Sequence, residues 1–250
     1  MKKLGYLFFA VLFLASCASR NMPSEKQKEV AVATQRVGEQ YYNSGRHTDA
    51  LKNLLEAYET IPDDPYLNNS LGLVYLAKER YDLAEKHFKK ALDLKSDYIQ
   101  AKNNLGAVYV KQEKWAQAIA CFEEVSKNLL YPTPEIPLSN LGLVYFHQKM
   151  YKKAKLYFNK SLETRHNLFA VHGLVLVDIE TGDYAQAVDF LHHELERDPG
   201  AAILHSDLAK AYEGLNDFTK ARRAWNVVLK LEPETSPLAR EAQKRLSDLN

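Results

Sequence analysis

A near-duplicated stretch inside the chain constrains its fold more than any other feature. Ser139–Leu162 reads SNLGLVYFHQKMYKKAKLYFNKSL, Ser70–Leu92 reads SLGLVYLAKERYDLAEKHFKKAL, and Asn104–Phe122 is a looser copy. Each copy carries apolar residues at helical spacing in two successive segments, as two helices packed into a hairpin require. One hairpin cannot bury both of its faces, so stability must come from stacking successive copies. The sequence therefore predicts an array of helical hairpins.

Equivalent glycines give the period of this array. Gly38 to Gly72 and Gly72 to Gly106 are 34 residues apart, and Gly106 to Gly142 is 36. The period and the order Leu-Gly, aromatic, Ala, aromatic within each copy resemble the tetratricopeptide repeat. The resemblance implies an all-α fold, a right-handed superhelical solenoid of six helix-hairpin repeats. Their expected bounds are 31–64, 65–98, 99–134, 135–167, 168–201 and 202–235.

Two repeats depart from the pattern. The third leaves the period at Leu129–Pro134 (LLYPTP), where prolines disfavour helix and add two residues before the next repeat. In the fifth, Leu174, Val175 and Asp178 stand where the family pattern has Leu, Gly and Tyr. We therefore expect an irregular junction after the third repeat and weaker definition in the fifth.

Residues 236–250 predict a last helix outside the repeats. Ser236 is a good N-cap and Pro237 suits the first helical position. One face of this helix is apolar and the others are charged, as at the end of a solenoid. We expect a capping helix, with a partner-binding helix as the alternative.

The first residues predict export. Lys2 and Lys3 precede the run Leu4–Leu14, which is apolar except for Gly5 and too short to span a bilayer. Such a pattern is typical of a signal peptide, here residues 1–16. An ordinary secretory signal, with the following cysteine incidental, is one interpretation.

A lipid anchor is the other interpretation. Leu14-Ala15-Ser16-Cys17 resembles the lipobox of bacterial lipoproteins. The resemblance implies that Cys17 becomes the N-terminus and carries a diacylglyceryl thioether and an N-acyl chain, with no other cofactor. Ala18, rather than Asp, implies that the lipoprotein-sorting machinery passes the chain to the outer membrane, where it faces the periplasm. Residues 17–30 would be the lipidated N-terminus and a polar tether.

Composition and cysteine usage exclude several classes of function. The 250 residues are 46% apolar and 26% charged with a net charge of +1, so charge gives no argument for nucleic acid binding. Removal of Lys2 and Lys3 would leave 31 basic residues against 32 acidic ones, or −1. Cys121 would then be the only thiol, which forbids an intramolecular disulfide. On an apolar helix face it is expected to be buried and inert.

Sequence signals of catalysis are absent. There is no glycine-rich phosphate loop, no GxSxG elbow and no HExxH motif, so we expect no enzyme. His192-His193-Glu194 is the densest group of potential metal ligands. Adjacent helix residues point in different directions, so we expect exposed helix polars and no metal site.

In tetratricopeptide arrays the first helix of each hairpin lines a concave groove, and the resemblance transfers those positions to this chain. The implied surface is apolar with interspersed amides, which suits a hydrophobic or amphipathic partner segment. A Lys/Arg clamp for a carboxylate is missing from the first repeats. The alternative is that neighbouring repeats or the tether cover part of this groove. The groove residues are Tyr42, Tyr66, Asn69, Leu73, Leu76, Asn103, Val110, Ile136, Leu143, Phe146, Phe169 and Leu176, with Asn43, Ala107, His147, His172 and Ile179 beside them.

Three features together point to a family. A lipobox, six repeats and the junction Leu130-Tyr131-Pro132 before Asn140–Val144 resemble the type IV pilus pilotin lipoproteins. The resemblance implies an outer-membrane lipoprotein that binds secretin subunits and promotes their localisation and multimerisation. A general periplasmic adaptor that scaffolds cell-wall enzymes or outer-membrane assembly factors is the alternative, because one fold serves many functions.

Overall fold

The computed structural model describes residues 22–249, and the regular secondary structure of that range is entirely α-helical. Residues 1–16 and Cys17, with the expected signal peptide and lipid anchor, lie outside the described residues. No helix between residues 22 and 249 is both long enough and apolar enough to cross a membrane. The helices are α1 (Glu25–Asn43), α2 (His47–Thr60), α3 (Pro65–Ala77), α4 (Tyr81–Leu94), α5 (Ile99–Lys111), α6 (Trp115–Ser126), α7 (Glu135–His147), α8 (Tyr151–Thr164), α9 (Leu168–Thr181), α10 (Tyr184–Arg197), α11 (Ala202–Gly214), α12 (Phe218–Leu231) and α13 (Pro237–Asp248).

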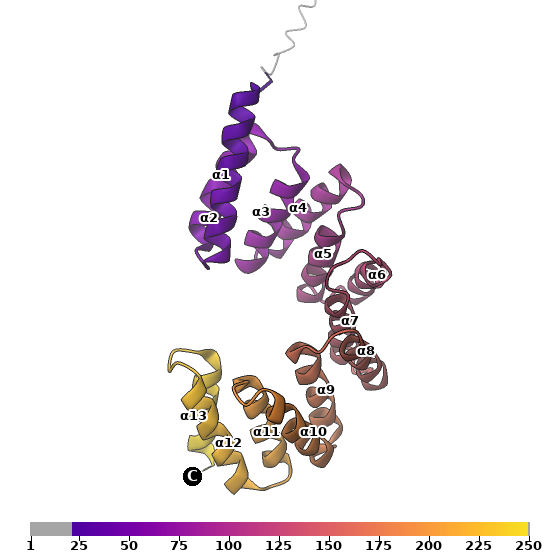
Figure 1. Cartoon of the computed structure of the whole chain (residues 1–250), viewed down its shortest axis with the longest axis vertical. Helices are drawn as coiled ribbons and strands as arrows, with labels where there is room; N and C mark the ends of the chain where they lie inside the picture. Colours follow the sequence, from indigo (N-terminus) through magenta and orange to yellow (C-terminus); the bar gives the residue numbers. More distant parts are fainter. Residues whose placement is uncertain (1–21, 250) are drawn as a thin grey trace, which may run out of the picture.

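Consecutive helices form six antiparallel pairs, α1/α2 through α11/α12, and α13 follows the last pair. Each pair packs on the next, so the array bends into the outline of a letter C (Figure 1). The first pair and the last pair form the two tips of the C and do not contact each other within the described residues. The all-α solenoid of six hairpins predicted from the repeat is confirmed.

Glycines in the first helices let the helices of a pair approach closely. A Cβ atom on Gly72 would lie 2.6 Å from the ring of Phe88, and one on Gly106 would lie 2.6 Å from Phe122. Both rings are fully buried. Burial of a phenylalanine side chain contributes about 1.5–3 kcal/mol, so these contacts are a main source of stability.

The first helix begins earlier than the repeat pattern indicates. α1 starts at Glu25, so the expectation that residues 17–30 form a tether is wrong from Glu25 onward. Ser24 and Gln27 form a capping box: the Gln27 N–H donates to Ser24 Oγ at 3.3 Å, and the Ser24 N–H donates to Gln27 Oε1 at 2.8 Å. This first turn is mostly exposed, which explains why its polar composition is typical of a linker.

The junction between the third and fourth pairs is a loop held by its own hydrogen bonds. The Leu130 N–H donates to Asn128 Oδ1 at 2.9 Å, and the Tyr131 N–H donates to the Asn128 carbonyl at 3.1 Å. The Tyr131 side chain is buried, whereas Leu129 and Leu130 are 98% and 93% exposed. As the prolines predicted, α6 ends before this loop and α7 begins after it.

The fifth pair, α9/α10, is built differently from the others. Val175 occupies the position of the glycine and is fully buried, and α9 and α10 contact each other less than the helices of the other pairs do. Gly173 lies two residues earlier and faces the preceding pair, against the ring of Phe158. The same ring lies against Gly142, where a Cβ would be 2.6 Å away. Phe158 therefore joins two successive pairs, and α9 approaches α7 and α11 more closely than the earlier first helices approach one another.

The last helix covers the end of the array. Ser236 Oγ accepts the Ala239 N–H at 3.0 Å, which caps α13 as predicted. Ala242 is fully buried, and Arg245 forms an ion pair with Glu213 of α11 at 3.2 Å. α13 therefore packs on α11 and α12 and keeps a charged outer face.

Candidate partner-binding groove

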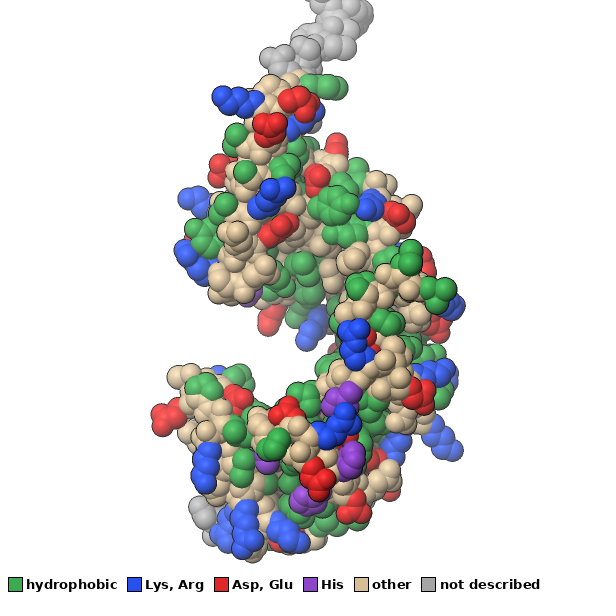
Figure 2. Space-filling view, viewed as in Figure 1, with side chains coloured by type: hydrophobic (Ala, Val, Ile, Leu, Met, Phe, Trp, Pro, Cys, Tyr) green, Lys and Arg blue, Asp and Glu red, His purple; other side chains and the backbone are tan. Residues whose placement is uncertain are grey.

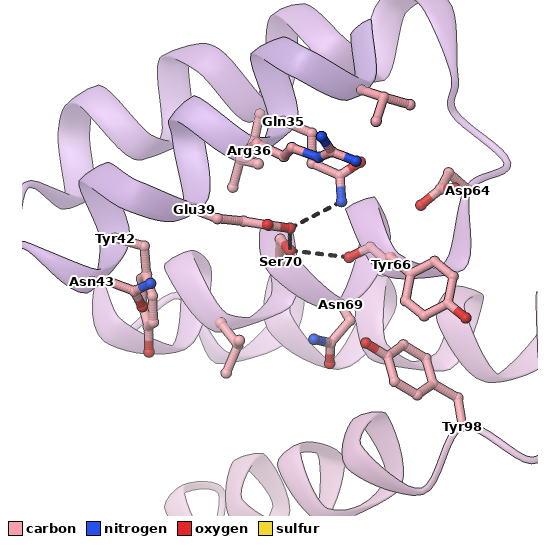
Figure 3. A pocket seen from close by; sticks show the side chains of 13 residues that line it. Gln35, Arg36, Glu39, Tyr42, Asn43, Asp64, Tyr66, Asn69, Ser70 and Tyr98 are labelled. Carbon is pink, nitrogen blue, oxygen red and sulfur yellow. Dashed lines mark hydrogen bonds between the residues drawn. The ribbon is translucent and has the colours of Figure 1, made fainter. Parts of the chain in front are cut away.

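The concave side of the array is hollowed between its two tips (Figure 2). Its first pocket has a volume of about 550 Å³ and is formed mainly by α1 and α3. Figure 3 shows Glu39 at its centre, where one carboxylate oxygen accepts Gln35 Nε2 at 2.9 Å and Ser70 Oγ at 2.7 Å. Arg36 and Asn43 line the same pocket. The polar part of the pocket is therefore organised before any partner binds.

Two tyrosines form one wall of this pocket. The rings of Tyr66 and Tyr98 meet edge to face with their centroids 5.2 Å apart, and Lys95 Nζ donates to Tyr66 Oη at 2.8 Å. Burial, with smaller contributions from Tyr66, Glu39 and Asp64, raises the pKa of Tyr98 to about 12. The Tyr98 phenol is therefore neutral at physiological pH, and the two rings present aromatic surface to the groove, which suits apolar or amphipathic segments.

A second pocket of about 530 Å³ lies further along the groove, between α5 and α7. Val110 and Leu143 supply its apolar part, and the rings of Trp115 and His147 stack with their centroids 5.5 Å apart. Lys111, Glu113 and Asn140 also line it. This pocket is thus aromatic and apolar with a charged border, a lining that can hold one large side chain of a partner.

The structure places the twelve groove residues in three settings. Tyr42, Tyr66, Asn69 and Leu73 line the first pocket, and Val110 and Leu143 line the second. Ile136 and Phe169 are exposed at the beginnings of α7 and α9. Leu76, Asn103, Phe146 and Leu176 are half-buried and line neither pocket.

Asn69 differs from the expectation of a free amide. Its side chain is buried, and its Oδ1 accepts Asn104 Nδ2 at 3.0 Å across the second and third repeats. Its carbonyl oxygen therefore links two repeats. Phe146 likewise packs against the rings of His147 and Tyr151, so part of its surface is used inside the protein.

The groove narrows at the fifth and sixth repeats. His172 Nδ1 of α9 lies 2.5 Å from Asp207 Oδ2 of α11, and Asp207 is fully buried. Burial raises the pKa of Asp207, and the hydrogen bond from His172 opposes that effect. The groove is narrower here because α9 approaches α7 and α11 more closely than the first helices of the first four repeats approach one another. The His172–Asp207 pair is not the cause, since Asn69 and Asn104 form an equivalent bridge between the second and third repeats.

Several lining residues were missed by the sequence reasoning. Arg36 comes from α1, Tyr98 from the loop before α5, and Trp115 from the first turn of α6, whereas Glu39 was already placed at a groove position from the sequence. The positions transferred from the family lie on first helices only, so Tyr98 and Trp115 could not be found that way. The aromatic character of both residues was the available signal.

The remaining expectations concern cysteine and histidine. Burial raises the pKa of Cys121 to about 11, so its thiol is protonated and unreactive at neutral pH. His192 and His193 are exposed, as expected. Glu194 is buried, and its Oε2 lies 2.6 Å from His166 Nε2, so the expectation that Glu194 is an exposed polar residue is wrong. Residues 22–249 contain no group of three side chains that could hold a metal ion.

Comparison with known families assigns the class. Models of the tetratricopeptide repeat match residues 29–97, 65–130 and 97–167, and a further one matches 178–246. These matches cover more than half of the chain, which belongs to the tetratricopeptide-repeat family.

The particular relatives come from type IV pilus systems. The chain is 30% identical over 127 residues to the type IV pilus assembly protein PilF of Pseudomonas aeruginosa, an alignment that spans 51% of this chain and 50% of PilF. It thus matches about half the length of that relative.

Solved structures share the fold. The crystal structure of PilW, described as a widely conserved type IV pilus biogenesis factor, has a TM-score of 0.73 at 19% identity, with 86% of this chain and 98% of PilW covered. The Pseudomonas aeruginosa PilF structure has a TM-score of 0.67 at 23% identity, with 88% and 100% covered. A tetratricopeptide repeat protein of Parabacteroides merdae has 0.69 at 18% identity, with 90% and 91% covered. These similarities establish the solenoid fold. They do not identify the partner that the groove binds.

Proposed function

We propose that this chain is a type IV pilus assembly adaptor of the pilotin kind, which binds secretin subunits and promotes their multimerisation in the outer membrane. The similarity to PilF over half of its length carries the proposal. The family fold and a groove with two pockets support it, because together they provide a surface for a peptide segment and no catalytic site is needed.

The groove of the first four repeats is the proposed binding site. Leu73, Val110 and Leu143 supply apolar surface to its two pockets, and Tyr66 and Trp115 supply aromatic surface. A hydrophobic or amphipathic segment of the secretin subunit would bury these side chains, and each 100 Å² of apolar surface removed from water contributes about 2.5 kcal/mol before the costs of association. The narrowed fifth and sixth repeats would stiffen the array at the other tip.

Lipidation at Cys17 is the second part of the proposal. One acyl chain binds a membrane only marginally, whereas two or more anchor a protein stably. The anchored chain would face the periplasm, hold the secretin subunit at the outer membrane and release it into the growing ring. This mechanism needs binding and position, and we propose no catalytic step.

Groove variants test the binding site. Leu73→Asp combined with Leu143→Asp places a charge in each pocket and should lower secretin binding at least tenfold. Leu55→Asp on α2 is the control for placing a charge at a leucine outside the groove, because Leu55 is exposed and lines neither pocket. Circular dichroism shows whether each variant folds, and Leu73→Asn with Leu143→Asn replaces the charged pair if it does not. Full secretin binding by a folded groove variant would contradict the proposed site.

The anchor is tested separately. Cys17→Ala should leave a protein that still binds secretin in solution but no longer supports secretin multimers in the outer membrane. Normal amounts of multimer in such a strain would refute the lipid-dependent step. Loss of a different set of outer-membrane or cell-wall proteins, with secretin unchanged, would favour the general adaptor.

A further inference from the structure

A short stripe on α8 stands apart from the groove. Lys153, Leu156 and Lys160 are all exposed and are spaced i, i+3 and i+7, so they share one face of the helix over about 10 Å. Leu156 is 49% exposed and lies between the two cations. The stripe lies on the second helix of its pair, and none of its residues lines either groove pocket.

The two ammonium groups of the stripe are positioned by aromatic rings. Lys153 Nζ lies 5.0 Å from the ring centroid of Tyr145, and Lys160 Nζ lies 5.3 Å from that of Tyr157. These two rings stack on each other with centroids 5.3 Å apart and planes 21° apart. The neighbouring Lys155 is the lysine that pairs with a carboxylate, Asp178, at 2.5 Å. Within residues 22–249, Lys153 and Lys160 have no acidic partner.

The equivalent positions in other repeats do not present this pattern. Lys90 corresponds to Lys160 but forms an ion pair with Asp63 at 2.9 Å. Lys220 corresponds to Lys153 but pairs with Asp217 at 3.0 Å. Two unpaired cations that flank an exposed leucine therefore occur on α8 alone among the second helices, so repeat architecture does not account for them.

The charge of the neighbouring helices limits what can bind. Glu124 on α6 and Asp189 and Glu196 on α10, the second helices on either side, are exposed acids. Exposed acids therefore lie on both neighbouring second helices, and α10 also carries the exposed Arg197 at its end. A flat anionic membrane would meet these acids as well, whereas a rod-shaped partner would meet the stripe alone.

We propose that the stripe Lys153–Leu156–Lys160 docks an acidic amphipathic helix of a protein partner. An apolar side chain of that helix would cover Leu156, and a carboxylate about one turn to either side would pair with each lysine. Because the two ammonium groups are already held over rings, little side-chain freedom is lost on binding. This surface is separate from the groove and does not depend on what the groove binds.

Site-specific cross-linking tests the docking surface. The full-length protein, made in its own cells with p-benzoylphenylalanine in place of Leu156, should cross-link to a protein segment in which acids flank an apolar residue on one helix face. Lys153→Glu with Lys160→Glu should reduce this product at least tenfold, and exchanging the acids of the captured segment for lysines should restore it. Lys52→Glu with Lys86→Glu, exposed lysines of α2 and α4, is the matched control and should leave the product unchanged.

Several results would overturn the proposal. They are the absence of any product, a product with lipid or with a second copy of this chain, a captured segment without acids, and a product that survives the double charge reversal. Binding of the purified protein to vesicles of phosphatidylglycerol and phosphatidylethanolamine that depends on Lys153 and Lys160 would assign the stripe to a membrane and reject the helix. The groove variants should leave the cross-link intact, so failure here is distinguishable from failure of the pilus role.

Discussion

The first four repeats and the last two use the same period to build different grooves. In the second and third repeats a glycine of the first helix lies against the aromatic ring of its own pair. In the fifth repeat Val175 replaces that glycine, and Gly173 turns to the ring of the preceding pair. The groove is open in the first region and narrowed in the second. A displacement of one small residue by two positions thus changes which neighbour a helix approaches.

The second and the sixth repeat, near the two ends of the array, bury different kinds of titratable group. In the second repeat His87 is buried between Tyr58 and Tyr75, and its Nδ1 lies 3.1 Å from Asn68 Oδ1. Asn68 uses its amide group to donate to the Pro62 and Asp64 carbonyls, so its oxygen is left to accept from His87. In the sixth repeat the buried group is the carboxyl of Asp207. Acid and base should therefore weaken different ends of the molecule.

Phe158→Ala should have the largest effect, because the ring joins the two regions. Loss of a fully buried phenylalanine lowers the free energy of unfolding by about 3–5 kcal/mol. Since the ring lies against both Gly142 and Gly173, hydrogen exchange measured by mass spectrometry should accelerate in α7, α8 and α9 together. Tyr157→Ala is the control, since Tyr157 is only half-buried and should cost less. Unchanged exchange in α9 would show that the fifth repeat does not depend on this ring.

His87→Gln should remove acid sensitivity from the first region. Burial lowers the pKa of His87 from 6.5 to about 4, so its contribution to stability is present above pH 6.5 and is lost as the pH falls through 4. The wild type should lose up to about 3 kcal/mol relative to the variant over this range. Urea unfolding at pH 7 and pH 4 measures the difference. His193→Gln, at an exposed site, is the control and should keep the difference in stability that the wild type shows between pH 7 and pH 4. Parallel stability curves for His87→Gln and wild type would contradict this account.

Asp207→Asn should have an effect of opposite sign in the last region. Burial raises the pKa of Asp207, so the stability that it contributes is present at low pH and declines as the pH rises above its ordinary value of 3.8. The hydrogen bond from His172 offsets part of the burial effect. The variant should therefore gain stability relative to wild type between pH 4 and pH 7. The same urea series measures it, with Asp189→Asn as the exposed control. A gap that shrinks as the pH rises would mean that the ion pair outweighs burial.

Most of the fold could be predicted because a few residues at fixed positions in each repeat determine how its two helices pack. The spacing of Gly72, Gly106 and Gly142 defined the pairs, and Ser236-Pro237 marked the start of the last helix. The start of α1 could not be predicted from apolar periodicity, because its first turn is exposed and is held by the Ser24–Gln27 capping box. The sequence showed that Val175 stands where the repeat pattern has glycine. The structural consequence depends on the contact between Gly173 and the preceding repeat, which the sequence does not show.

The groove was less predictable than the fold. Family positions indicated Tyr66, Leu73 and Leu143, which do line pockets, yet the same rule placed Asn69 there as a free amide although Asn104 occupies its oxygen. The narrowing around α9 depends on how closely one first helix approaches the next. That distance is set by packing between repeats, and periodicity within a repeat carries no information about it.

The gap between the two tips of the array bears on how a bound segment could leave. The α1/α2 pair and the α12/α13 end do not contact each other, so the groove is open along one side (Figure 2). A segment whose two ends are both attached to folded bodies can move in and out sideways and never has to be threaded. If the chain acts as we propose, such a groove can release an internal stretch of its partner without waiting for a free chain end.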